Sequence, residues 1–153
     1  MKIAIGADHG GYTLKTTLVE HLRLLGHDVA DMGTDSTEPV DYPDIARRVA
    51  ERLVLGRAER GILLCGSGVG AGIAANKIAG IRAAVCHDAF SARQGVEDDD
   101  MNLLCLGARV IGAELAKDLA DVFLKARFSG AERHVRRLNK VRALEHEQEC
   151  AEA

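Results

Sequence analysis

The sequence predicts an α/β protein: a three-layer αβα sandwich around a five-stranded parallel, Rossmann-like sheet. Short apolar runs of strand length alternate with segments whose apolar residues recur at helical spacing. The short runs are apolar almost without interruption, which is typical of parallel strands covered on both faces. No linker, repeat or low-complexity segment divides the chain, so residues 1–153 are expected to form one domain.

The expected elements alternate along the chain. Strands are predicted over residues 2–8, 27–33, 60–65, 81–88 and 102–107. Helices are predicted over 12–25, 43–56, from about 70, as a short segment after 88, and over about 112–127. Gly26 follows the first helix as its C′ residue, while Pro43 begins the second helix and Gly56 ends it.

The last predicted helix, roughly 131–148, differs from the others because it is strongly charged. Its apolar stripe is thin and consists of Val135, Leu138, Val141 and Leu144. Such a stripe can cap its own domain or pack on a second subunit, and the sequence leaves both open.

Composition excludes several classes of function. Aromatic residues make up 3% of the chain and the net charge is −3, which argues against nucleic-acid binding. The N-terminus lacks the apolar core of a signal peptide and no run approaches about 18 apolar residues, so we expect a cytoplasmic protein without membrane contact. The cysteines show no CxxC spacing and are expected to be free thiols, by default buried apolar residues: Cys65, Cys86, Cys105 and Cys150.

Residues 62–72, ILLCGSGVGAG, place a cysteine at the end of a predicted strand and a glycine-rich turn after it. Ligands of parallel sheets bind outside the carboxyl ends of the strands, so this turn is a candidate site. Gly66, Gly68 and Ala71 fit a dinucleotide fingerprint, with Asp88 about twenty residues further on. However, the fingerprint falls in the third strand–helix unit, and the chain that follows is too short for a second half and a substrate domain.

The same loop suits proton-transfer chemistry. Backbone N–H groups of a glycine-rich turn form a nest for negative charge, and this field also stabilises a thiolate at Cys65. A thiolate beside an oxyanion hole acts as a nucleophile or as a base. Acyl transfer would require a histidine partner, which the sequence does not identify. Proton abstraction next to a carbonyl requires only the base, the oxyanion donors and a proton-delivering group, for which Ser67 is available.

Several segments together carry a family resemblance: IAIGADHGG (3–11), VDYPD (40–44), GILLCGSGVGAGIAANKIAGIRAA (61–84), NLLCLGARVIG (102–112) and ERHVRRLNKV (132–141). With them the chain resembles the ribose-5-phosphate isomerase B family, which includes the two-subunit galactose-6-phosphate isomerases. The resemblance implies an isomerase of ribose 5-phosphate and ribulose 5-phosphate that works through a cis-enediolate, with no metal or organic cofactor.

The resemblance also implies catalytic roles. Cys65 matches the base that moves a proton between C1 and C2, and Ala71 stands where other members carry a glutamate base. Ser67 matches the hydroxyl that handles protons at the substrate oxygens. The amides expected to hold the enediolate oxygen are those of Gly66, Gly68 and Gly70.

Four cations match or adjoin the family's phosphate-binding residues: His9, Arg109, Arg133 and Arg137. The last two lie four residues apart and would project from one helix face, although taken alone they would be read as part of a solvated charged face. Asp8 matches a residue that contacts sugar hydroxyls and helps to open the ring. Tyr42 lies on the substrate side in relatives, or packs in the turn before Pro43.

One segment departs from the family pattern. Where relatives present a histidine that assists furanose opening, followed by asparagine or aspartate, this chain has Asp98 and Asp99. Asp98 performs the acid–base work itself, or Asp8 opens the ring alone, or the substrate is a tetrose phosphate that needs no ring opening. Both carboxylates would repel phosphate and are expected at the sugar end, unless the run is simply an exposed helix end.

The expected partner is thus a small sugar phosphate, and relatives form dimers or tetramers with shared active sites. The helix over 131–148 would then lie at a subunit interface. Tetrose, allose or galactose phosphate remain alternative substrates. A nucleotide-binding αβ module would keep the glycine loop but would not need Cys65.

Overall fold

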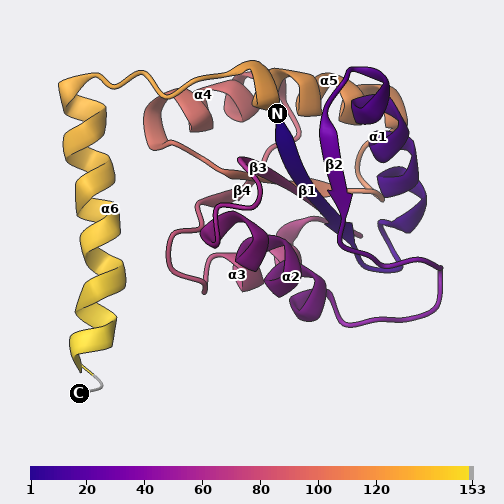
Figure 1. The fold of residues 1–153 in the computed structure, drawn as a ribbon, viewed down its shortest axis with the longest axis horizontal. Helices are drawn as coiled ribbons and strands as arrows, with labels where there is room; N and C mark the ends of the chain where they lie inside the picture. Colours follow the sequence, from indigo (N-terminus) through magenta and orange to yellow (C-terminus); the bar gives the residue numbers. More distant parts are fainter. Residues whose placement is uncertain (152–153) are drawn as a thin grey trace.

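The computed structural model describes residues 1–151 and has the predicted three layers (Figure 1). Its five strands are β1 (Lys2–Ala7), β2 (Asp28–Asp31), β3 (Arg60–Cys65), β4 (Ala83–Val85) and β5 (Leu103–Gly107). All strand pairs are parallel, and the order across the sheet is β2-β1-β3-β5-β4. The predicted fold class is therefore confirmed.

The described part of the chain contains six helices: α1 (Tyr12–Leu24), α2 (Tyr42–Val54), α3 (Val69–Ala75), α4 (Ala89–Asp99), α5 (Ala113–Lys125) and α6 (Glu132–Ala151). Helices α1, α4 and α5 cover one face, and α2 and α3 cover the other (Figure 1). Gly26 and Gly56 have positive φ just after α1 and α2, as expected of C′ residues. No helix in the described part of the chain is long and apolar enough to cross a membrane.

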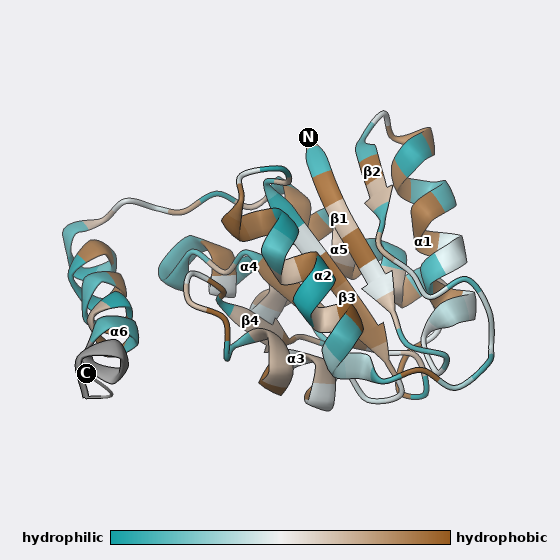
Figure 2. Ribbon diagram, turned by 60° about the horizontal axis from the view of Figure 1, so that its bottom comes forward, coloured by the Kyte–Doolittle hydropathy of each residue, from teal (hydrophilic) through white to brown (hydrophobic). Residues whose placement is uncertain are grey.

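Each face of the sheet buries its own apolar layer. Ile62 of β3 packs with Leu18 and Phe123 on one face, whereas the next residue, Leu63, packs with Val49 on the other. Successive strand residues point to opposite faces, so a strand that is covered twice must be apolar throughout. Figure 2 shows the result, with hydrophobic β1 and β3 at the centre and hydrophilic residues on the outer side of α2.

The fourth strand is shorter than the predicted 81–88. Only Ala83, Ala84 and Val85 pair with β5. Because β4 is an edge strand, it has a partner on one side only, and the chain leaves the sheet at Cys86 and His87.

The strand order brings three loops together. β1, β3 and β5 are neighbours in the sheet, although β2 and β4 lie between them in the sequence. From β1 the chain first adds β2 on one side and then crosses back to add β3 on the other side. The carboxyl ends of β1 and β3 therefore form the switch point, which is where open α/β sheets bind ligands. The loops that begin at Asp8, Gly66 and Ala108 emerge there.

Helix α6 does not belong to either layer. Figures 1 and 2 show it standing beside the domain, joined to α5 by an extended segment, and it packs chiefly on α4. Within its predicted apolar stripe Leu138 is buried, but Val135, Val141 and Leu144 are exposed. The stripe therefore caps its own domain only in part.

Candidate active site

The thiol of Cys65 lies at the centre of the converging loops. The residue ends β3 and is 5% exposed, and the backbone N–H of Gly68 donates to its Sγ at 3.0 Å. Gly68 has a φ of +83°, and a Cβ there would lie 3.0 Å from the carbonyl carbon of Leu106. Only glycine fits this conformation and this clearance, so the loop is built to direct one amide at the sulfur. The Gly68 N–H is thus aimed at the thiol, not at a substrate oxygen as the sequence suggested.

Ser67 is the exposed polar residue of the loop. Its Oγ accepts a hydrogen bond from the N–H of Val69 at 3.2 Å, which holds the hydroxyl at the surface of the turn. A Cβ on Gly107 would lie 2.6 Å from the Ser67 carbonyl oxygen, so the loop rests directly on the end of β5. In the first turn of α3, the N–H of Gly70 has no carbonyl partner within the helix and remains a donor.

Asp8 is held beside this loop. Its Oδ1 accepts from the N–H groups of Gly10 at 2.9 Å and Gly11 at 3.2 Å, and its own N–H donates to Leu64 O at 3.2 Å. A Cβ on Gly10 would lie 3.3 Å from the nitrogen of Gly66, which measures how closely the two loops approach. A carboxylate held by two amides is preorganised and stays in place without a ligand.

His9 and Arg109 supply the side-chain nitrogen donors of this region. The Nδ1 atom of His9 accepts the N–H of Val40 at 3.2 Å, so the proton of the neutral ring lies on Nε2 as a donor. The guanidinium of Arg109 lies over Gly66, where an added Cβ would be 3.5 Å from its Nε.

Tyr42 covers the far end of the loop. It begins α2 and is 41% exposed, and its ring rests on Gly70, where an added Cβ would lie 2.9 Å from Cζ. The missing side chain at Gly70 therefore makes room for the ring. This position is compatible with both interpretations of Tyr42, because the ring packs on Gly70 and is also partly exposed beside the loop.

The predicted site residues fall into two groups. The loop cluster contains Asp8, His9, Tyr42, Cys65–Gly70 and Arg109. The helix cluster contains Asp98, Asp99, Arg133 and Arg137. The latter lies at the end of α4 and in the first two turns of α6, beside the domain and away from the carboxyl ends of the strands (Figure 1). One chain therefore brings together the loop cluster but does not join the helix cluster to it.

The acidic run at the end of α4 is only partly a solvated helix end. Asp98 Oδ1 lies 3.4 Å from His134 Nε2, and Asp100 Oδ2 lies 3.0 Å from Arg82 Nη2. Asp99 is exposed, in accordance with the simpler interpretation. The positive charge of Arg82 offsets the unfavourable position of the Asp100 carboxylate at the helix C-terminus.

Two histidines near the clusters were not predicted as site residues. His134 lies between the two arginines of α6 and is 5% exposed. The sequence signal for the burial of His134 was its spacing of four from Leu138, because this spacing places both residues on one helix face. His87 follows β4, and its Nε2 accepts the N–H of Gly107 at 2.9 Å beside the loop cluster. The sequence signal for His87 was its position at the end of the predicted strand 81–88, where ligand-binding residues of parallel sheets lie.

The cysteines differ in their surroundings. Cys65, Cys86 and Cys105 are free thiols, while the side chain of Cys150 lies outside the described part of the chain. Burial raises the pKa of Cys86 to about 11 and that of Cys105 to about 12. These two behave as apolar core residues, and of the three described thiols Cys65 alone has a donor aimed at its sulfur.

Comparison with known proteins identifies the chemistry that this geometry serves. The chain matches the family model described as Ribose/Galactose Isomerase over residues 3–141. It belongs to this family. It is 47% identical over 144 residues to ribose-5-phosphate isomerase B of Escherichia coli, covering 94% of this chain and 96% of that one. It is 46% identical over 131 residues to D-erythrulose-4-phosphate isomerase of Pectobacterium atrosepticum, covering 85% and 86%.

Solved structures agree with this assignment. Ribose-5-phosphate isomerase B of Clostridium thermocellum superposes with a TM-score of 0.95 and 49% identity, covering 97% of this chain and 99% of that one. The protein is a sugar-phosphate isomerase, and the family resemblance read from its sequence is confirmed. Among the described residues, no group of three or more His, Cys, Asp or Glu side chains is arranged to hold a metal ion.

Proposed function

We propose that this isomerase interconverts ribose 5-phosphate and ribulose 5-phosphate, with Cys65 as the base. The observation that carries the proposal is the 3.0 Å hydrogen bond from the Gly68 N–H to the Cys65 sulfur, at the centre of the loop cluster. The basic form of a cysteine is the thiolate, and this backbone N–H is placed to donate a hydrogen bond to it. The names of the E. coli and C. thermocellum relatives support the choice of substrate.

In the proposed reaction the Cys65 thiolate removes the proton from C2 of the open-chain aldose. The C–H electron pair forms the C1–C2 double bond, and negative charge develops on O1. The amides of Gly66 and Gly70 are the donors for this oxygen. The Ser67 hydroxyl moves a proton from O2 to O1, and the thiol then returns its proton to C1. No oxidant or reductant is required.

Phosphate binding requires both clusters. His9 and Arg109 are in the loop cluster, whereas Arg133 and Arg137 are exposed on one face of α6 and form no ion pair with a described carboxylate. We propose that the helix cluster of one protomer completes the loop cluster of another in a homodimer, alone or paired into a tetramer. The exposed part of the α6 stripe would contribute to that contact. The proposed location is the cytoplasm, where reducing conditions keep Cys65 as a thiol.

A four-carbon substrate is the second candidate, and Asp98 is the observation that favours it. A tetrose phosphorylated at O4 cannot close a furanose ring, so the missing ring-opening histidine would not affect its turnover. The Pectobacterium relative is named for this chain length. The alternative reaction interconverts D-erythrose 4-phosphate and D-erythrulose 4-phosphate.

A panel of aldose phosphates with four, five and six carbons tests both candidates. We expect the highest kcat/KM with ribose 5-phosphate, and solvent deuterium at C1 of the ketose formed in D2O. A value at least about tenfold higher with erythrose 4-phosphate would replace the first candidate by the second. The absence of turnover with every member would reject the proposed function.

A further inference from the structure

We propose that Asp98 is a positioning residue that holds α6 in place, and that it does not exchange protons with the sugar. Together with Ser129 and His134 it forms a latch, and this latch sets the direction in which Arg133 and Arg137 point. The inference rests on the proposed phosphate-binding role of these two arginines.

The carboxylate of Asp98 is engaged on both oxygens. Its Oδ2 accepts from Nε2 of Gln94 at 2.8 Å, one turn earlier on α4. Its Oδ1 lies 3.4 Å from Nε2 of His134. The first contact lies within α4 and the second joins α4 to α6, whereas a general acid or base must reach the reacting oxygen of the substrate.

The His134 ring is held at both nitrogens. Its Nδ1 lies 2.6 Å from Ser129 Oγ, which itself accepts the N–H of Ala131 at 3.2 Å. In the proposed latch the serine hydroxyl donates to Nδ1, and this tautomer places the proton of the neutral ring on Nε2, facing Asp98. In addition, the N–H of Ser129 donates to Glu97 O at 2.9 Å. The start of α6 is thus tied to the last turn of α4 at two points.

This contact determines the rotation of α6 about its own axis. His134 and Leu138 are four residues apart, and both are buried against the domain. Arg133 and Arg137 form the adjacent row, displaced by about 100° around the helix, and both are exposed. If the row of His134 turns, the two guanidinium groups turn with it.

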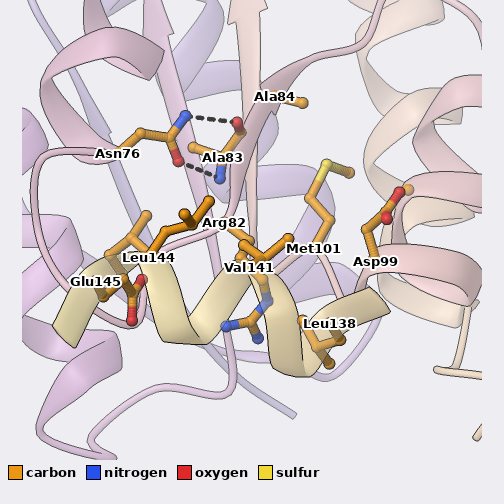
Figure 3. A pocket seen from close by; sticks show the side chains of 12 residues that line it. Asn76, Arg82, Ala83, Ala84, Asp99, Met101, Leu138, Val141, Leu144 and Glu145 are labelled. Carbon is orange, nitrogen blue, oxygen red and sulfur yellow. Dashed lines mark hydrogen bonds between the residues drawn. The ribbon is translucent and has the colours of Figure 1, made fainter. Parts of the chain in front are cut away.

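Apolar packing further along α6 is incomplete, so the latch provides much of what prevents α6 from rotating about its own axis. A cavity of about 460 Å³ lies between α6 and the domain. Figure 3 shows Leu138, Val141 and Leu144 on its helix side, opposite Met101 and Arg82. Further towards the C-terminus, Glu145 Oε1 accepts the N–H of Gly80 at 2.9 Å. Between the latch and this contact, Arg142 Nη2 lies 3.9 Å from Asp100 Oδ2. Polar contacts at three places therefore hold α6, and the Asp98–His134 contact is the one nearest to Arg133 and Arg137.

Steady-state kinetics distinguish a latch from an acid–base group. Asp98→Asn keeps an acceptor for His134 and a partner for the Gln94 amide, so we expect kcat and KM within about threefold of wild type. Asp98→Ala and His134→Ala should each raise KM and the Ki of inorganic phosphate about tenfold at nearly unchanged kcat. The double variant should show the same KM and Ki as either single variant, because both substitutions break one contact. A loss of about 100-fold in kcat for Asp98→Asn, a lost limb in its pH profile, or additive effects of the two alanine variants would overturn the proposal.

Hydrogen exchange of the free protein tests the latch without any substrate. Amides in residues 132–138 should exchange about tenfold faster in Asp98→Ala and His134→Ala, and at the wild-type rate in Asp98→Asn. Arg93→Ala, which removes an exposed pair with Glu97 on the same helix, is the matched control and should not change them. Unchanged exchange in both latch variants would overturn the latch. Failure of the wild type to isomerise any sugar phosphate would instead reject the proposed function and leave this result intact.

Discussion

The loop cluster and the helix cluster are held in opposite ways. In the loop cluster, the loops after three adjacent strands carry all the side chains except Tyr42, and glycines allow these loops to approach within van der Waals contact. In the helix cluster, one helix stands beside the domain over a cavity and is held by a few polar contacts. Proton transfer requires geometry fixed to fractions of an ångström, whereas phosphate binding by long arginines tolerates a movable support. The difference is consistent with a site whose loop cluster comes from one chain and whose helix cluster comes from another.

The largest expected effect is the loss of the base from the loop cluster. Cys65→Ala should lower kcat about 10³-fold because it removes the proposed proton acceptor while leaving the amides in place. Turnover and solvent deuterium incorporation measure it. Cys86→Ala is the matched control, since that thiol is buried and lies outside the loop cluster, and it should keep wild-type kcat. A loss below tenfold for Cys65→Ala would assign the base to another group.

Mixing two inactive variants tests whether the clusters belong to different chains. Cys65→Ala damages only the loop cluster, and Arg137→Ala damages only the helix cluster. If sites are shared across a twofold dimer, each mixed dimer contains one intact site, so random mixing should restore about a quarter of wild-type activity. Activity after co-refolding is the measurement, with native mass spectrometry to count mixed dimers. Mixed dimers without activity would show that each site is built from a single chain.

A substitution pair on α3 probes how close the packing of the loop cluster is. Gly70→Ala would place a Cβ 2.9 Å from the Tyr42 ring, displacing the ring and raising KM several-fold. Gly72→Ala, on the same helix, would meet the side chain of Cys105, with Sγ at 3.5 Å and Cβ at 4.0 Å, both ordinary contacts. The second variant should leave activity unchanged and raise the free energy of unfolding by about 0.5–1 kcal/mol. Equal KM values in the two variants would contradict the packing of Tyr42 on Gly70.

The smallest effect concerns the buried thiols beneath the clusters. Burial raises the pKa of Cys86 to about 11 from its ordinary 9.0, so the unfolded chain loses this proton first as pH rises. The contribution of the protonated Cys86 thiol to the free energy of unfolding is present in full below pH 9 and declines between pH 9 and about 11. Urea unfolding at a series of pH values should show this decline, and Cys86→Ala should reduce its slope. An unchanged slope in the variant would remove Cys86 as a cause.

The loop cluster could be predicted from the sequence because it is assembled from strand ends. Cys65 and Asp8 each follow an apolar run, and parallel strands place such positions at one edge of the sheet. The glycines between Gly66 and Gly70 are local signals as well. What the sequence could not show was the target of each amide, since the direction of the Gly68 N–H depends on its left-handed backbone over the end of β5.

The sequence by itself determined the fold class, the order of the elements and the residues of the loop cluster, because periodicity and strand ends are properties of short segments. It also placed Arg133 and Arg137 on one helix face. Only the tertiary structure decided where that face lies, and that Asp98 is engaged by His134 and Gln94. Those contacts depend on the path of the extended segment between α5 and α6, which no periodic pattern encodes.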